Sequence, residues 1–119
     1  FQRWAEPLED GIARVLVENL SQLLGTARID VFPWKTPVPA EYQIRVMLIR
    51  FDGAPGEQAV LKARWSLTAA GQEKPVVDIM SVMTEPVESN THAALVAAQN
   101  RTLDRLSREI AGAIQAQRR

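Results

Sequence analysis

The residue types that carry most catalysis are scarce in this sequence. His92 is the only histidine, and there is no cysteine. The chain therefore cannot supply a His-based triad, a multi-His metal site, a thiol nucleophile, a disulfide or a zinc knuckle. Phosphate-loop, dinucleotide-binding, nucleophile-elbow and H-E-x-x-H motifs are missing. No carboxylate pair stands out from ordinary solvated charges. We expect a non-enzyme with no catalytic residue, no cofactor and no metal.

Charge and hydropathy narrow the function classes further. Lysine and arginine total 14, and aspartate and glutamate also total 14, so no net field attracts nucleic acid or another polyanion. The longest apolar runs are far shorter than the roughly 18 residues of a membrane-spanning helix. The chain begins at Phe1 without methionine. We expect a single domain over residues 1–119, with the true N-terminus of the protein before Phe1.

A long hairpin over residues 41–71 is the centre of the predicted fold. Two β-prone runs flank the segment GAPG at residues 53–56, a composition typical of a four-residue hairpin loop. We predict a register with Asp52 opposite Glu57, because it gives one apolar face built from three pairs: Ile44 with Trp65, Val46 with Ala63, and Leu48 with Leu61. A slip of one residue would turn the apolar set outward. Trp65 is therefore predicted to be buried.

Two amphipathic helices are predicted to cover this face. The first spans residues 6–25, with Pro7 in its first turn and Gly25 after its last residue. The last begins after a cap at Ser89, Asn90 or Thr91. Apolar residues at three- and four-residue spacing define the buried stripes: Leu8, Ile12, Val15, Leu16, Leu20, Leu23 and Leu24 in the first helix, and Leu95, Ala98, Leu103, Leu106, Ile110, Ala113 and Ile114 in the last.

The polar faces of both helices are predicted to be solvated. In the first helix this face carries Arg14, Glu18, Asn19 and Gln22. In the last helix, Asp104 is placed to pair with Arg108, and Arg105 with Glu109, as i,i+4 ion pairs.

Two more strands complete the predicted sheet. Residues 27–32 alternate as a short strand, which Pro33 ends or confines to an edge, and Pro37 and Pro39 stiffen the following connection. Residues 76–85 form the third strand of a meander, with Ile79 opposite Leu67. The predicted fold class is α+β, an antiparallel sheet with a long central hairpin and meander, and two helices packed on one face.

The other face of the sheet has no cover in this sequence, and it is the candidate interaction surface. The register places an apolar patch there, with Met80 and Val82 pointing outward from the third strand, and it sets Arg45 across from Arg64, an unfavourable like-charge pair unless an acid neutralises it. Two other readings are open: a preceding segment covers the face, or a bulge near Ile49 turns the patch inward. The predicted surface for self-association or partner binding is Arg45, Ile49, Phe51, Val60, Arg64 and Val82. Charge substitution at Phe51 and Val60 is then expected to weaken assembly without changing the melting temperature.

Six groups of short segments, in order along nearly the whole chain, carry a family resemblance: Arg3-Trp4-Ala5-Glu6-Pro7-Leu8; Ala13-Arg14-Val15-Leu16 with Glu18-Asn19-Leu20; Phe32-Pro33-Trp34; Arg50-Phe51-Asp52-Gly53; Ala63-Arg64-Trp65-Ser66-Leu67; and Leu106-Ser107-Arg108-Glu109-Ile110. Together they resemble the PqiC/YmbA-like ABC-type transport auxiliary lipoproteins. The stretch from Val76 to Met83 departs from this likeness, because it is more apolar than the arginine-bearing stretch expected there.

The resemblance implies a role and a location. It implies a Gram-negative lipoprotein of the periplasm, anchored to the inner leaflet of the outer membrane through a lipidated cysteine and followed by a first strand, both before Phe1. It also implies work with an MCE-domain protein and its membrane permease components in lipid transport between the two membranes. We further expect the protein to be a homo-oligomer. The family offers no catalytic residues to carry over.

Three functions remain open at this point. A docking subunit would hold an MCE-type conduit against the outer membrane and needs an exposed contact surface. A periplasmic lipid carrier needs an apolar cavity between sheet and helices. An outer-membrane lipoprotein of another envelope assembly machine would share the architecture. Small inward residues, namely Ala59, Ala63, Ala98 and Ala113, favour close packing of helix on sheet and hence the docking subunit.

Overall fold

The computed structural model describes residues 8–24, 29–31 and 42–117. Its elements in chain order are α1 (Leu8–Leu24), β1 (Ile29–Val31), β2 (Tyr42–Gly53), β3 (Gln58–Ala69), β4 (Val77–Pro86) and α2 (His92–Gln117). The expectations for Pro7, Gly25, Pro33, Pro37 and Pro39 lie outside the described residues.

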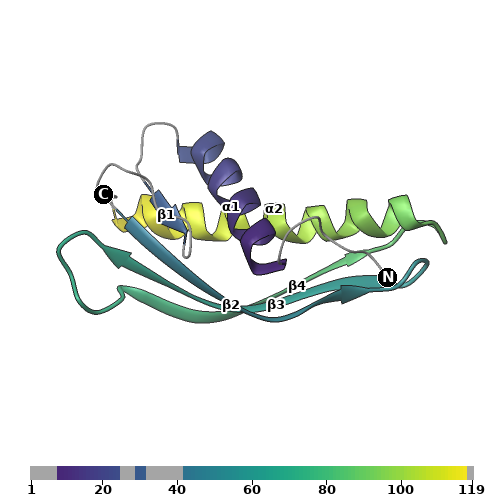
Figure 1. The fold of residues 1–119 in the computed structure, drawn as a ribbon, viewed down its shortest axis with the longest axis horizontal. Helices are drawn as coiled ribbons and strands as arrows, with labels where there is room; N and C mark the ends of the chain where they lie inside the picture. Colours follow the sequence, from purple (N-terminus) through teal and green to yellow (C-terminus); the bar gives the residue numbers. More distant parts are fainter. Residues whose placement is uncertain (1–7, 25–28, 32–41, 118–119) are drawn as a thin grey trace.

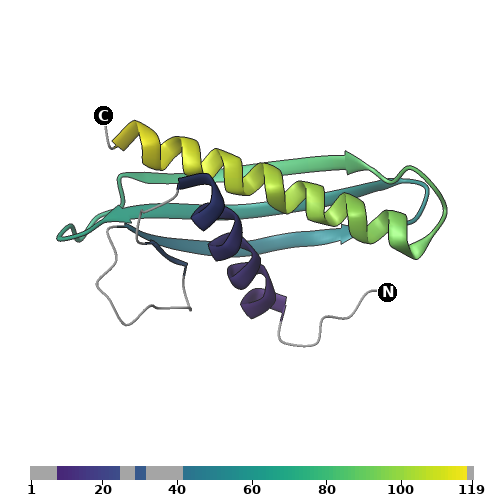
Figure 2. The same ribbon diagram turned by 90° about the horizontal axis from the view of Figure 1, so that it is seen from above.

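The four strands form one sheet in the order β1-β2-β3-β4. β2, β3 and β4 are an antiparallel meander, whereas β1 pairs in parallel with β2, from Ile29 opposite Tyr42 to Val31 opposite Ile44. α2 runs along the length of the sheet, and α1 crosses it at a steep angle on the same face (Figures 1 and 2). This is the predicted α+β architecture, and the short strand predicted at residues 27–32 is β1.

The predicted register of the central hairpin is wrong, although its inward face is largely right. Ile44 lies opposite Leu67 and Val46 opposite Trp65, two residues away from the predicted pairs. An even shift keeps every side chain on its own face. The loop and the extra residue Ile49 of β2 together set this shift. Ala54–Glu57 connects the strands instead of residues 53–56, so that Gly53 lies opposite Ala59, three positions from its predicted partner, and the extra residue reduces the difference to two farther from the loop. The amide of Glu57 donates to the carbonyl of Ala54 at 3.1 Å, and φ of Gly56 is +77°, as in a type II turn with proline before glycine.

A β-bulge in β2 changes the face of the strand near the loop. The pairing with β3 shifts between Leu48 and Arg50, so Ile49 is the extra residue. Both Leu48 and Phe51 then pack against the core, which strict alternation would not permit at a spacing of three residues. The predicted outward orientation of Phe51 is therefore wrong, and the bulge considered as an alternative is present.

The core lies between the sheet and the two helices. Trp65 is buried at 1% exposure, as predicted, although its neighbours across the strands are Val46 and Ile79. Met83 is buried, as predicted, whereas Ile79 is 42% exposed because it lies on an edge strand. The largest fully buried side chains are Trp65, Leu16, Leu20, Ile44, Leu61, Leu67, Leu103, Leu106, Ile110, Ile114 and Thr102.

The predicted helix cap and helix stripes match the structure closely. Thr91 caps α2, since its Oγ1 accepts a hydrogen bond from the amide of Ala94 at 3.1 Å. Of the seven stripe residues predicted in α2, six are buried and Ala113 is partly buried against the core. In α1, Ile12, Leu16, Leu20 and Leu24 are buried, and Val15 and Leu23 pack partly buried against them.

Two polar helix residues expected in solvent, Asn19 and Arg105, instead bind other elements. Asn19 of α1 donates to Ser107 Oγ of α2 at 3.0 Å. Of the two predicted i,i+4 pairs, Asp104 with Arg108 is present at 3.0 Å. Arg105 pairs with Glu85 of β4 at 3.2 Å, so its predicted pairing with Glu109 is wrong.

Candidate functional site

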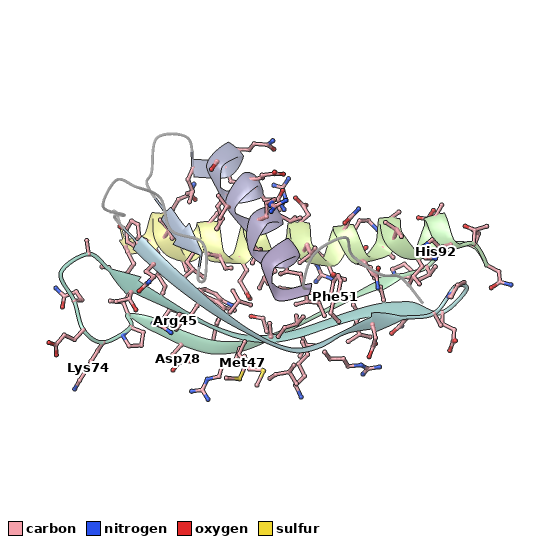
Figure 3. The ribbon with its side chains drawn as sticks, in the orientation of Figure 1. Arg45, Met47, Phe51, Lys74, Asp78 and His92 are labelled. Carbon is pink, nitrogen blue, oxygen red and sulfur yellow. The ribbon has the colours of Figure 1, made fainter. Side chains whose placement is uncertain are left out.

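The candidate site is the face of β2, β3 and β4 opposite the helices, which we call the open face. The pairing of the strands sets Met47 of β2, Arg64 of β3 and Met80 of β4 side by side in one row across the sheet. In the neighbouring row, Lys62 of β3 lies beside Val82 of β4. Met47 is 65% exposed, Met80 48% and Val82 55%. Figure 3 shows Met47 and Asp78 pointing away from the helices. The open face thus carries three exposed apolar side chains, Met47, Met80 and Val82, which we call the strip, with Arg64 between Met47 and Met80.

The structure places most of the predicted surface residues on the open face. Four of them occupy outward positions of the sheet: Arg45, Arg64 and Val82, which are exposed, and Val60, which is partly buried. Ile49 is the bulged residue and is 48% exposed. Phe51 does not belong to this surface, because it is partly buried against the core on the helix side.

The predicted like-charge pair is also wrong. Arg45 lies opposite Ser66, and Arg64 lies between Met47 and Met80. Arg64 donates two hydrogen bonds to the carboxylate of Asp78, from Nε at 2.9 Å and from Nη2 at 3.1 Å. These bonds hold the pKa of Asp78 below its usual value. The fork also joins β3 to the outer strand β4.

The open face carries more positive than negative charge. Its strand positions include Arg45, Arg50, Lys62 and Arg64 against Asp52 and Asp78. Arg50 Nε donates to Asp52 at 2.7 Å, so both acids are engaged by arginines of the same face. A partner with acidic groups would complement this charge.

Two hollows lie on the open face, one near each end of the hairpin. The first, of about 370 Å³, is lined by Arg45, Met47, Arg64, Trp65, Ser66, Thr68, Glu73, Pro75 and Asp78. The second, of about 440 Å³, is lined by Arg50, Asp52, Gly53, Ala54, Glu57, Gln58 and Val60. Charged side chains lie around both hollows, and Met47 and Pro75 add apolar surface to the first, a mixed lining of the kind found at protein contacts.

In the described part of the chain, no three or more histidine, cysteine, aspartate and glutamate side chains gather closely enough to hold a metal ion. His92 is exposed at the first position of α2. Neither described helix has the length and apolar character needed to cross a membrane.

A sequence comparison identifies the family. The family model described as the ABC-type transport auxiliary lipoprotein component matches residues 1–111. The chain belongs to this family. The resemblance carried by the short segments is thereby confirmed, and the chain is a transport auxiliary component of lipoprotein type. None of the curated proteins is similar enough to this auxiliary lipoprotein to match it.

Solved structures share the fold of the auxiliary lipoprotein. An uncharacterised protein is 22% identical with a TM-score of 0.75, and 93% of this chain covers 69% of that chain. A DUF330 protein of Xanthomonas campestris is 19% identical with a TM-score of 0.70, and 97% of this chain covers 66% of it. A Chlamydia trachomatis protein, CT253, is 8% identical with a TM-score of 0.64, and 98% of this chain covers 92% of it. The auxiliary lipoprotein chain spans about two thirds of the first two structures.

Sequence reasoning left Met47 out of the auxiliary lipoprotein's surface, and it placed Met80 in the outward apolar patch without naming it among the predicted contact residues. Met47 is the most exposed large apolar side chain in the described residues, and Met80 completes its row. Side chains of a strand alternate between its two faces, and this alternation is regular between Tyr42 and Leu48, before the bulge. Met47 could therefore have been predicted to point outward, because Val46 and Leu48 on either side of it point inward. The wrong register hid the neighbourhood of Met47, Arg64 and Met80.

Proposed function

We propose that this auxiliary lipoprotein docks the periplasmic conduit of an MCE/ABC-type intermembrane lipid transport system to the outer membrane. In this role it is a non-catalytic, homo-oligomeric subunit in the periplasm, held at the inner leaflet of the outer membrane by an N-terminal lipid. Its partners are the MCE-domain protein and the associated permease components. The observation that supports this role is the exposed strip of Met47, Met80 and Val82 on a sheet face with no described helix over it, since exposed apolar patches commonly mark contacts.

The packing of the two layers favours docking over lipid carriage. Ala59, Leu61, Ala63 and Leu67 of β3 face the helices with 0% exposure, and Ile110 and Ile114 of α2 are equally buried. Side chains therefore fill the space in which a carrier would hold an acyl chain.

The docking proposal is tested by placing charge on the strip. The double variant Met47→Asp, Val82→Asp should bind the periplasmic fragment of the MCE-domain protein at least about tenfold more weakly, because a carboxylate must then be desolvated at the contact. Binding would be measured by biolayer interferometry, together with the melting temperature. Both side chains are already exposed, so the melting temperature should hardly change.

The matched control places the same charge elsewhere. Asn100→Asp, Gln115→Asp adds two carboxylates at exposed positions of α2 and should bind like the parent chain. Equal binding by the strip variant and the parent would refute the strip as the docking surface. Capture of components of a different envelope machine in a pull-down would favour the third function considered from the sequence.

A further inference from the structure

β4 is the outermost strand on its side of the sheet. In an antiparallel pair, alternate residues direct both backbone groups toward the neighbouring strand, and the others direct them away. The amide of Val87 donates to the carbonyl of Glu57 at 2.8 Å, which extends the β3–β4 register by one pair. The backbone groups of the even-numbered residues of β4 therefore point to the free edge: Asp78, Met80, Val82, Thr84 and Pro86.

α2 closes one half of this edge. Arg105 Nη1 donates to the carbonyl of Thr84 at 2.9 Å, and Arg101 Nη2 donates to the carbonyl of Pro86 at 2.8 Å. The carboxylate of Glu85 binds both guanidinium groups. Its Oε1 lies 2.9 Å from Arg101 Nε, and its Oε2 lies 3.2 Å from Arg105 Nη1. Pro86 also lacks an amide hydrogen. Side-chain caps and proline are known means of preventing an edge strand from pairing.

Among the described residues, nothing caps the other half of the edge. No hydrogen bond from a described residue reaches the outward backbone groups of Met80 and Val82. Three exposed apolar side chains lie beside these groups, with exposures of 42% for Ile79 on the helix side and of 48% for Met80 and 55% for Val82 on the open face. Ser81, between them on the helix side, is buried. An exposed apolar edge of this kind invites strand pairing unless a partner covers it. Residues 78–82 are therefore the part of β4 that can pair with a further strand, because the arginines of α2 cap only Thr84 and Pro86.

We propose that the edge at residues 78–82 accepts an extended segment of a partner protein as a fifth strand. Asp78, Met80 and Val82 would supply the backbone hydrogen bonds, over about 14 Å of strand. The exposed apolar side chains on both faces require apolar residues on both faces of the segment. Lys62, next to Val82 on the open face, favours an acidic residue on that side near Val82, whereas Arg64 already binds Asp78. The identity of the partner rests on the proposed docking role, whereas the strand addition does not.

The test uses a synthetic probe, the dye-labelled peptide Thr-Val-Ile-Val-Glu-Val-Thr, with binding followed by fluorescence anisotropy. In an added strand, one alternate set of peptide amides faces β4 and the other faces solvent. N-methylation of one set should therefore weaken binding at least about tenfold, and methylation of the other set should leave it within about threefold. Lysine in place of the glutamate should also weaken binding. Absence of binding by the parent peptide, or equal binding by both methylated peptides, overturns the proposal.

Variants of Met80 test the same contact from the protein side. Met80→Pro removes an outward amide without breaking a bond to β3 and should weaken peptide binding about tenfold, whereas Met80→Ala keeps the amide and should change it less than about threefold. If Met80→Pro fails to fold, the methylated peptides carry the test. If sedimentation shows a dimer of the parent chain that Met80→Pro dissociates, the occupant is a second copy and the proposal is wrong.

The same variant separates this inference from the docking role. Peptide binding without any binding of the MCE-domain fragment refutes the docking role and supports the edge. Fragment binding that Met80→Pro does not change refutes the edge as the partner's site.

Discussion

At the scale of single residues, Trp65 connects the sheet to α2. Its Nε1 donates to Ser81 Oγ at 2.9 Å and to Glu109 Oε2 at 3.2 Å, and Ser81 donates to the same carboxylate. A buried indole N–H needs an acceptor, and here the acceptors come from β4 and α2. Trp65 thus helps to set the position of α2, which carries the arginines that cap the sheet edge.

Trp65→Ala is predicted to be strongly destabilising. Removing a fully buried aromatic side chain should lower the free energy of unfolding by about 3–5 kcal/mol, and it also leaves Ser81 and Glu109 without the indole donor. Urea denaturation monitored by circular dichroism measures this loss. Met47→Ala is the control, because an exposed side chain should change stability by less than about 0.5 kcal/mol. A loss below about 1 kcal/mol for Trp65→Ala would disprove its place in the core.

The alternation of apolar residues was sufficient to predict the burial of Trp65 and Met83, but it could not predict the contacts of Arg105 and Glu109. These two residues are spaced to pair with each other on one helix. Their actual partners lie on β4 and β3, and only the distance between layers decides which pairing forms. The same holds for Asn19, whose partner Ser107 is 88 positions away. Because Phe51 packs on the core, charge at Phe51 is expected to destabilise the fold instead of leaving the melting temperature unchanged.

At the scale of elements, the bulge in β2 shows why the register was missed. Leu48 and Phe51 are both apolar but three residues apart, and an uninterrupted strand would put them on opposite faces. That spacing was a signal for the bulge, although it did not give its position. The parallel pairing of β1 had no signal in so short a strand, because pairing direction depends on the path of the chain between β1 and β2.

The capped half of β4 gives a prediction at this scale. Arg101→Ala, Arg105→Ala uncovers the carbonyls of Thr84 and Pro86 and should increase concentration-dependent association, because a longer edge becomes available for pairing. Sedimentation velocity at several concentrations measures the change relative to the parent chain.

Arg108→Ala provides the matched control for the edge prediction. Arg108 is exposed on the same helix and pairs with Asp104 within α2, so its removal should leave association unchanged. Adding Met80→Pro to the double variant should reverse the rise. An unchanged sedimentation profile in the double variant would argue that the arginines do not protect the edge.

At the scale of the whole molecule, the helices bury one face of the sheet in the core, and the other face of the sheet is left for contact with a partner. Both helices lie on one face of the sheet (Figures 1 and 2), which leaves the open face and the edge of β4 as neighbouring surfaces. Met80 and Val82 belong to both, since they are exposed on the open face and their backbone groups point to the edge. A partner strand on β4 would therefore extend the open face, and the two contacts would form one continuous surface.

The filled interlayer space gives the last prediction, which concerns lipid content. The helix-facing residues of β3 from Ala59 to Leu67 are at most 1% exposed, and an acyl chain could enter only by separating α2 from the sheet. Such a separation would break the bonds among Trp65, Ser81 and Glu109. Protein purified from a Gram-negative host should accordingly yield well under one lipid per chain when its organic extract is quantified by mass spectrometry. A lipid-binding protein purified from the same cells is the positive control. Stoichiometric lipid in the extract would contradict the docking role and favour the carrier, because a chain that opens to hold lipid cannot have a permanently filled core.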